Sequence, residues 1–140
     1  MDSVLLDTDV LSYLFKQDSR GEIYKPYLDG KLGVISFMTV AELEFWANIR
    51  NWGAQRRAAL SAFLEPYTII NSDVELAYTW ASIRSEVMRD GHHIDTADCW
   101  IAATARLHVI SALNSQHPAF YARERSYHAL RNGSELFDLI

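Results

Sequence analysis

Short β-prone runs alternate with helical segments along most of this chain, and this alternation restricts the fold more than any other feature of the sequence. The β-prone runs lie at residues 4–6, 34–37, 67–70 and 109–113. Segments with helical spacing of apolar residues separate them, at residues 10–15, 39–49, 55–64, 72–88 and from residue 96 onward. Such alternation predicts a three-layer α/β/α fold in which helices cover a central parallel sheet. Ligands of such folds bind where strands end and helices begin.

Chain length and charge limit the organisation and the kind of surface that this fold presents. A chain of 140 residues fits a single domain over residues 1–140 with a core of its own. It carries 13 basic and 18 acidic residues, a formal net charge of −5. This balance argues against a broad nucleic-acid-binding surface, so any contact with nucleic acid must be local.

The sequence carries no recognisable signal for export or membrane insertion. Acidic residues interrupt the only apolar run near the N-terminus, which lacks the basic start of a signal peptide. No apolar stretch reaches the roughly 18 residues of a membrane span. Cys99 is the sole cysteine, so an intramolecular disulfide is excluded. We expect a cytoplasmic protein with no membrane contact.

Acidic residues recur at the junctions between predicted elements, whereas the glycine-rich phosphate loops, the serine-hydrolase elbow and the zincin helix motif are all missing. Carboxylates that converge on one edge of a sheet repel each other unless a cation lies between them. Mg²⁺ prefers such oxygen ligands and can activate a bound water. The acids at these junctions are Asp7, Asp9, Glu42, Asp95 and Asp98.

Each of these acids also has a purely structural interpretation. Thr39 and Glu42 fit an S/T-x-x-E capping box, in which Glu42 would only bond back to the start of its helix. Asp9 and Asp98 fit first-turn positions, where they favour the helix dipole. Asp7 directly follows three apolar residues, and a carboxylate at a strand end needs a partner. The sequence alone leaves both interpretations open.

Two further helix starts are indicated by capping patterns. Ser72 and Glu75 form a second capping box that predicts the start of a helix reaching about Met88. Asp95 or Thr96 can cap the helix that follows.

Aromatic and basic residues offer weaker indications of function. Helical spacing favours core packing for the tryptophans, with base stacking as the alternative, and an apolar patch between subunits is a third possibility for Trp46, Trp52 and Phe63. Arginines in the C-terminal tail fit a solvated face or phosphate contacts. The residues concerned are Trp46, Trp80 and Trp100 among the tryptophans, and Arg123, Arg125 and Arg131 among the arginines.

Three motifs together resemble those of the PIN-domain proteins, and in particular the VapC-type toxins of bacterial toxin–antitoxin pairs. They lie at residues 5–11, 39–43 and 98–105, in the family's order and spacing. The resemblance implies a Mg²⁺- or Mn²⁺-dependent endoribonuclease. Its acidic positions fall on Asp7, Glu42 and Asp98, with Asp7 and Asp98 as direct metal ligands.

The resemblance extends to supporting residues and departs from the family at one position. Thr8 and Asp9 match the polar pair after the first acid, and Asn114 matches the polar residue after the fourth strand. Many relatives carry a fourth acid where this chain has His117. A histidine there can contact a phosphate or bind Mn²⁺, and Asp95 can replace part of the missing charge.

The resemblance further implies an RNA substrate, a VapB-type antitoxin whose tail enters the acidic cleft, and a homodimer. Two alternatives remain at this point. One is a catalytically silent PIN fold that binds RNA or protein. The other is an aspartyl phosphatase of the haloacid dehalogenase type, because Asp7 and Asp9 form a D-x-D pattern.

Overall fold

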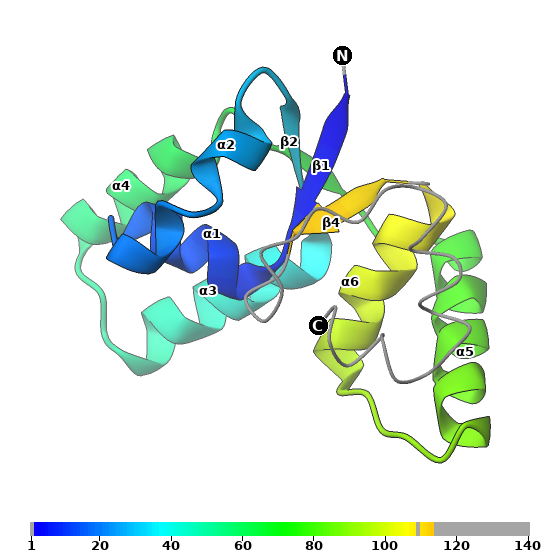
Figure 1. Cartoon of the computed structure of the whole chain (residues 1–140). Coiled ribbons are helices and arrows are strands. Elements are labelled where there is room, and N and C mark those ends of the chain that lie inside the picture. Colours follow the sequence, from blue (N-terminus) through cyan, green and yellow to red (C-terminus); the bar gives the residue numbers. More distant parts are fainter. Residues whose placement is uncertain (1, 109, 114–140) are drawn as a thin grey trace.

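The central sheet has four parallel strands in the order β3-β2-β1-β4 (Figure 1). The computed structural model describes residues 2–108 and 110–113. The strands are β1 (Ser3–Leu6), β2 (Leu32–Ser36), β3 (Thr68–Ile70) and β4 (Ser111–Leu113). All of the β-prone runs of the sequence therefore contribute a strand, and the predicted three-layer α/β/α fold is confirmed.

Helices connect every pair of consecutive strands. Two short turns of helix that the sequence did not predict, η1 and α2, follow α1 before the chain enters β2. The helices are α1 (Thr8–Phe15), η1 (Ser19–Gly21), α2 (Lys25–Leu28), α3 (Phe37–Ile49), α4 (Ala54–Leu64), α5 (Val74–Arg89) and α6 (Thr96–Leu107).

Alternate residues of the strands face two different helical layers, because successive side chains of a strand point to opposite faces. Val4, Leu6 and Ile35 pack with side chains of α1, α3 and α4. Leu5 and Val34 point the other way, against α6. These five side chains are at most 3% exposed. The sheet is therefore buried on both faces, as parallel sheets require.

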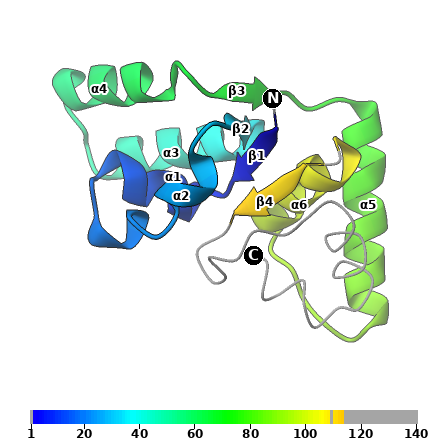
Figure 2. The same cartoon turned by 45° about the horizontal axis from the view of Figure 1, so that its top comes forward.

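Helix α5 lies outside α6 and runs beside it in both views (Figures 1 and 2). Leu76, Ile83 and Val87 of α5 pack against small residues of α6, among them Ala102 and Ala103. The small side chains let the two helices approach closely. Trp80 and Trp100 join this cluster with ring centroids 5.5 Å apart. Their predicted packing role is confirmed.

The order in which the chain adds strands to the sheet reverses at β1. From β1 it moves through β2 to the edge strand β3, and it then returns through α5 and α6 to β4 on the other side of β1. The connections on the two sides use opposite faces of the sheet (Figure 2). Such a reversal opens a crevice at the carboxyl ends of the adjoining strands. Any ligand site of this fold is expected there, next to Asp7.

Two helix starts differ from the sequence prediction. Helix α3 begins at Phe37, and Ser36 is its N-cap, accepting a hydrogen bond from the Met38 backbone N–H at 3.1 Å. Phe37 is thus not part of the strand. Helix α5 is capped by Asp73 and not by Ser72, so the capping box predicted there was wrong.

None of the described helices is long and apolar enough to cross a membrane. Several predicted residues lie outside the described part of the chain: Asn114, His117, Arg123, Arg125 and Arg131.

Replacing Asp73 with Ala is expected to destabilise the protein by about 1 kcal/mol. The Asp73 carboxylate accepts a hydrogen bond at 2.8 Å from the N–H of Leu76, which is fully buried in the α5–α6 cluster. Chemical denaturation of Asp73→Ala measures the loss. The neighbouring Ser72→Ala is the control, with an expected change within about 0.5 kcal/mol. A larger effect for Ser72→Ala than for Asp73→Ala would contradict the assigned cap.

Candidate active site

Asp7 is held where β1 ends and α1 begins. It is the N-cap of α1, and its Oδ1 accepts a hydrogen bond from the Val10 backbone N–H at 2.8 Å. The strand residues before it are fully buried, and Asp7 itself is only 8% exposed. The N-cap bond and the helix dipole stabilise its charged form. Asp7 therefore has a structural role that fixes its carboxylate at the carboxyl edge of the sheet.

Glu42 is tied to the same edge through two buried hydroxyl groups. Thr8 Oγ1 donates to Glu42 Oε1 at 2.7 Å, and Thr39 Oγ1 lies 3.0 Å from Thr8 Oγ1. A threonine hydroxyl has one proton, and that of Thr8 points to the carboxylate, so Thr39 is the donor in the second bond. The chain of donors therefore runs from Thr39 through Thr8 to Glu42, joining α3 back to α1.

This arrangement rules out the capping-box interpretation of Glu42. Ser36 caps α3, and Thr39 lies inside the helix with its hydroxyl directed to Thr8. Burial raises the pKa of Glu42, the hydrogen bond from Thr8 opposes that rise, and the charge of Asp9 adds to it. The carboxylate of Glu42 is thus poised to bind a proton or a cation.

Asp98 lies in the first turn of α6, on the other side of the crevice. Burial and, to a smaller extent, the negative charges of Asp95, Glu42 and Asp9 together raise its pKa to about 6. These causes place the carboxylates of α1, α3 and α6 within electrostatic reach of one another. The structure therefore brings together Asp98, Glu42 and Asp9, and it holds Asp7 next to Thr8 at the same edge.

Asp95 occupies the N-cap position of α6, but its side chain makes no capping hydrogen bond. Its Oδ1 lies 3.2 Å from Nε2 of His93, and both side chains are exposed. The prediction that Asp95 is a helix cap was therefore correct for the backbone position and wrong for the side chain. Its charge instead adds to the acidic group around Asp98.

Thr39 lies inside α3 and contacts Thr8, so the prediction that it caps this helix was wrong. It is fully buried on the side of α3 that carries Leu43, one turn later. A polar residue at a buried position of a helix needs a hydrogen-bond partner, and this was the available signal. The match to a capping box concealed it.

The carboxylate oxygens of Asp7, Glu42 and Asp98 are ligands of the kind that a hard divalent cation prefers. Mg²⁺ is usually held by one or two carboxylates and keeps several waters. Among the described residues there is no group of three or more His, Cys, Asp or Glu that could hold a metal ion. A site of few protein ligands and many waters is the arrangement that these acids permit. A cation would also relieve the repulsion that raises the pKa of Asp98.

Comparison with known proteins identifies the family. A model of the PIN domain matches residues 4–125. The chain belongs to the PIN-domain family. The PIN match covers all of the acids described above, and it replaces the aspartyl phosphatase interpretation of Asp7 and Asp9.

Proteins of similar sequence and proteins of similar fold both agree with this assignment. The chain is 28% identical to ribonuclease VapC2 of Haemophilus influenzae over 102 residues. These residues make up 73% of this chain and 77% of the relative. A toxin–antitoxin complex from Klebsiella pneumoniae contains a chain with 27% identity and a TM-score of 0.59, covering 79% of this chain and 83% of that one. The structure of VapBC2 from Rickettsia felis, bound to a DNA fragment from its promoter, contains a chain of the same fold at 21% identity, with a TM-score of 0.69. The match covers 79% of this chain and 86% of that one.

Asp98→Asn is expected to stabilise the metal-free protein at neutral pH. Because the folded-state pKa of Asp98 is about 6, against 3.8 for the ordinary group, the native state binds more protons between these values. Stability contributed by the protonated group is therefore lost as pH rises from about 4 to about 6. Asn carries no charge and avoids this loss, which is at most about 3 kcal/mol.

Denaturation in EDTA at pH 3.5 and pH 7.5 measures this effect, with the exposed Asp29→Asn as the control. We expect a gain in stability for Asp98→Asn at the higher pH and almost none at the lower one. Equal stability of wild type and Asp98→Asn at both pH values would show that Asp98 is not destabilised by its surroundings.

Proposed function

We propose that this chain is the toxin of a toxin–antitoxin pair and acts as a metal-dependent endoribonuclease. The observation that carries the proposal is the hydrogen-bond chain from Thr39 through Thr8 to Glu42, next to the N-cap Asp7 at the switch point of a PIN fold. Asp98 lies in the first turn of α6, which covers the other face of the sheet. Membership of the PIN family and similarity to a ribonuclease support it. Similarity to a chain of a toxin–antitoxin complex supports the antitoxin partner.

Asp7 and Asp98 are the residues that would hold Mg²⁺, or Mn²⁺ in its place. They belong to helices that cover opposite faces of the sheet, α1 and α6. When bound, the ion would polarise the phosphodiester and activate a water molecule. Neither carboxylate acts as a nucleophile in this proposal.

Glu42 positions the attacking water and accepts its proton. A carboxylate with a raised pKa is a better proton acceptor near neutral pH than an ordinary one. Thr8 fixes the orientation of Glu42, and Thr39 fixes Thr8. The water oxygen forms a bond to phosphorus while the bond to the 3′ oxygen breaks, which leaves a 3′-hydroxyl and a 5′-phosphate. The 3′ oxygen takes its proton from solvent.

The remaining site residues have supporting roles in the proposal. Asp9 is exposed in the first turn of α1 and adds negative charge to the cleft. Asn114 follows β4 in sequence, and His117 takes the place of the family's fourth acid. The roles of Asn114 and His117 stay predictions, because both lie outside the described residues.

The acidic cleft also suits a protein partner. A VapB-type antitoxin that places a basic side chain among these carboxylates would neutralise them and occupy the cation's position. The predicted homodimer needs a different surface. Trp46, Trp52 and Phe63 pack against the core and are not a free patch. Phe45 and Ile49, one turn apart on α3, are more than half exposed and are better candidates for the subunit contact.

Cleavage of a mixed cellular RNA pool tests the proposal. Purified protein, free of antitoxin, is incubated with Mg²⁺, with Mn²⁺ and with EDTA, beside Asp7→Asn and Asp98→Asn. We expect cleavage by the wild type with either ion, no cleavage in EDTA, and a loss of at least about a hundredfold in each variant. Circular dichroism checks that the variants are folded.

Two results would contradict the proposal. Full activity in both variants would show that these acids are not the metal ligands. Binding of RNA without cleavage under any metal condition would instead favour a silent PIN-fold binding module.

Thr8→Val is expected to lower kcat by about tenfold, because Glu42 loses a hydrogen bond to its charged form. The same loss raises the pKa of Glu42, so the acidic limb of the pH–rate profile moves to higher pH. Thr8→Ser keeps the hydroxyl and should restore both kcat and the profile. A lower kcat with an unchanged pH profile would mean that Thr8 acts only through packing.

A further inference from the structure

Four basic side chains gather at the end of α1 that lies away from the acidic cleft. Lys16 follows α1, Arg20 lies in η1, Arg50 ends α3, and Arg56 lies in the first turn of α4. Burial lowers the pKa of Lys16, and the charges of Arg50, Arg56 and Arg20 lower it further. Segments far apart in the sequence therefore place positive charge on one surface.

Each arginine of this group lies over an aromatic ring. The rings are half-buried and pack against the main core cluster, so they form a firm base. The distances from guanidinium carbon to ring centroid are 4.2 Å for Arg20 over Tyr13, 5.5 Å for Arg50 over Trp46 and 4.1 Å for Arg56 over Trp52. We call Lys16 with these three arginines and their rings the arginine–aromatic face.

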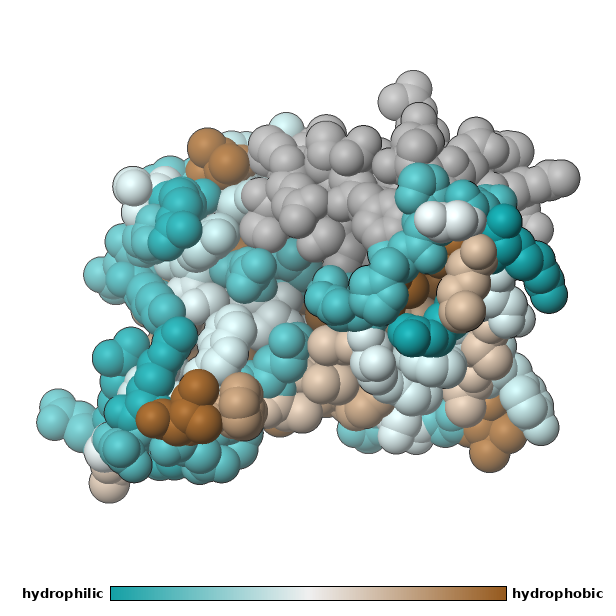
Figure 3. All heavy atoms as spheres, turned by 90° about the horizontal axis from the view of Figure 1, so that it is seen from below, coloured by the Kyte–Doolittle hydropathy of each residue, from teal (hydrophilic) through white to brown (hydrophobic). Residues whose placement is uncertain are grey.

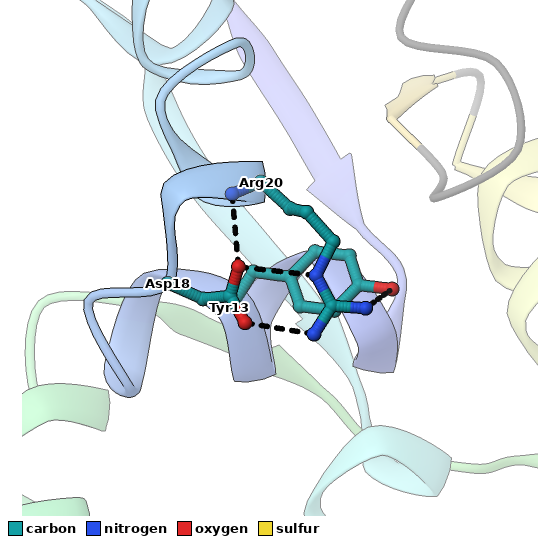
Figure 4. A network of polar contacts seen from close by, with 3 residues as sticks. All are labelled: Tyr13, Asp18 and Arg20. Carbon is teal, nitrogen blue, oxygen red and sulfur yellow. Dashed lines mark hydrogen bonds and ion pairs between the residues drawn. The ribbon is translucent and has the colours of Figure 1, made fainter.

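Arg20 shows how firmly one of these groups is held (Figure 4). Its Nε and Nη2 donate to the Asp18 carboxylate at 3.0 and 2.7 Å, and its Nη1 donates to the Tyr13 hydroxyl at 3.4 Å. Within the described residues these bonds use three of the five guanidinium N–H groups. The remaining donors are held in a fixed plane, which lowers the entropy lost on binding a planar or tetrahedral anion.

The positive charge of the face is largely uncompensated. Asp18 is the acid that acts on Lys16. No carboxylate of the described residues lies within ion-pair distance of Arg50 or Arg56, whereas Arg57 and Arg106 each pair with a glutamate. Such a local excess of positive charge is unusual in a chain with a net charge of −5. A local positive surface of this kind is what an acidic protein would need to bind nucleic acid.

Helix α1 links this face to the acidic cleft. Asp7 and Asp9 are at its N-terminal end and Lys16 is at its C-terminal end, and its eight residues span about 12 Å. That distance corresponds to about three or four stacked nucleotides of one strand. The hydrogen bonds to Asp18 are the main cause of the raised pKa of Arg20, and the charge of Asp9 makes a small contribution to it. Seen from below, the end of the molecule that α1, α3 and α4 occupy is mainly hydrophilic (Figure 3).

We propose that the arginine–aromatic face binds the phosphate backbone of the RNA strand that leaves the acidic cleft. This inference rests on the proposed ribonuclease function. Guanidinium groups bind phosphates in a bidentate manner, and stacking on a ring leaves their N–H edges available. The acidic cleft repels the backbone on its own, so a positive surface a few nucleotides away offsets that repulsion. The face increases the affinity for RNA and fixes the orientation of the strand, without recognising its base sequence.

Binding of RNA by a cleavage-deficient protein tests this inference. A short fluorescein-labelled single-stranded RNA of mixed sequence is titrated with Asp98→Asn, in Mg²⁺, between about 50 and 200 mM salt. Adding Arg50→Gln and Arg56→Gln should weaken binding by about tenfold, and the slope of log K against log salt should fall by about 1.4 for the two lost phosphate contacts. The matched control is Asp98→Asn with Lys31→Gln and Arg89→Gln, which loses the same charge elsewhere.

The outcomes separate this inference from the proposed function. Cleavage by wild type with unchanged RNA binding in Arg50→Gln/Arg56→Gln would overturn the face while the ribonuclease function stands. Equal losses in the matched control would also overturn it, because they would show an effect of net charge alone. Normal RNA binding with weakened antitoxin binding would reassign the face to a protein partner. A wild type that neither binds nor cleaves RNA would overturn both proposals.

Discussion

The burial of carboxylates at one edge of the sheet, together with the repulsion between them, is the constraint on which the rest of this structure depends. Burial and neighbouring negative charges both disfavour the charged form of Asp98. The protein offsets part of this cost with donors at fixed positions, namely the Val10 N–H on Asp7 and the Thr8 hydroxyl on Glu42. The remainder is left for a cation. A bound divalent ion would remove this free-energy cost of the charged carboxylates. The ligand-free fold is therefore suited to bind one.

The parallel sheet makes this concentration of charge possible. Strand β1 lies at the reversal of the topology, so the crevice at its carboxyl end receives residues from both helical layers. Helix α1 then separates the two signs of charge. Asp7 and Asp9 at its N-terminus and Lys16 at its C-terminus each agree with the helix dipole. The arrangement that stabilises α1 is therefore the same one that places an acidic cleft and a basic surface at opposite ends of one helix.

The sequence predicted the layers, and it placed acids at the junctions between elements, because both follow from local patterns. Hydrophobic runs of strand length and helical spacing are properties of neighbouring residues, and Asp7 and Asp98 follow from their places at element junctions. Contacts between distant segments could not be predicted in this way. Thr39 matched a capping box in sequence, yet in the structure it donates to Thr8, 31 positions earlier. The arginine–aromatic face brings together residues of α1, η1, α3 and α4, and no local pattern predicts that these segments lie side by side.

The carboxylates of Asp7 and Asp98, at the starts of α1 and α6, are proposed to bind a divalent ion at the carboxyl edge of the sheet. Anomalous scattering from crystals soaked in Mn²⁺ would locate such an ion. We expect a manganese peak with oxygen ligands from Asp7 and Asp98, and loss of that peak in crystals of Asp98→Asn. A peak bound elsewhere, or no peak in a protein that cleaves RNA in the presence of Mn²⁺, would contradict this proposal.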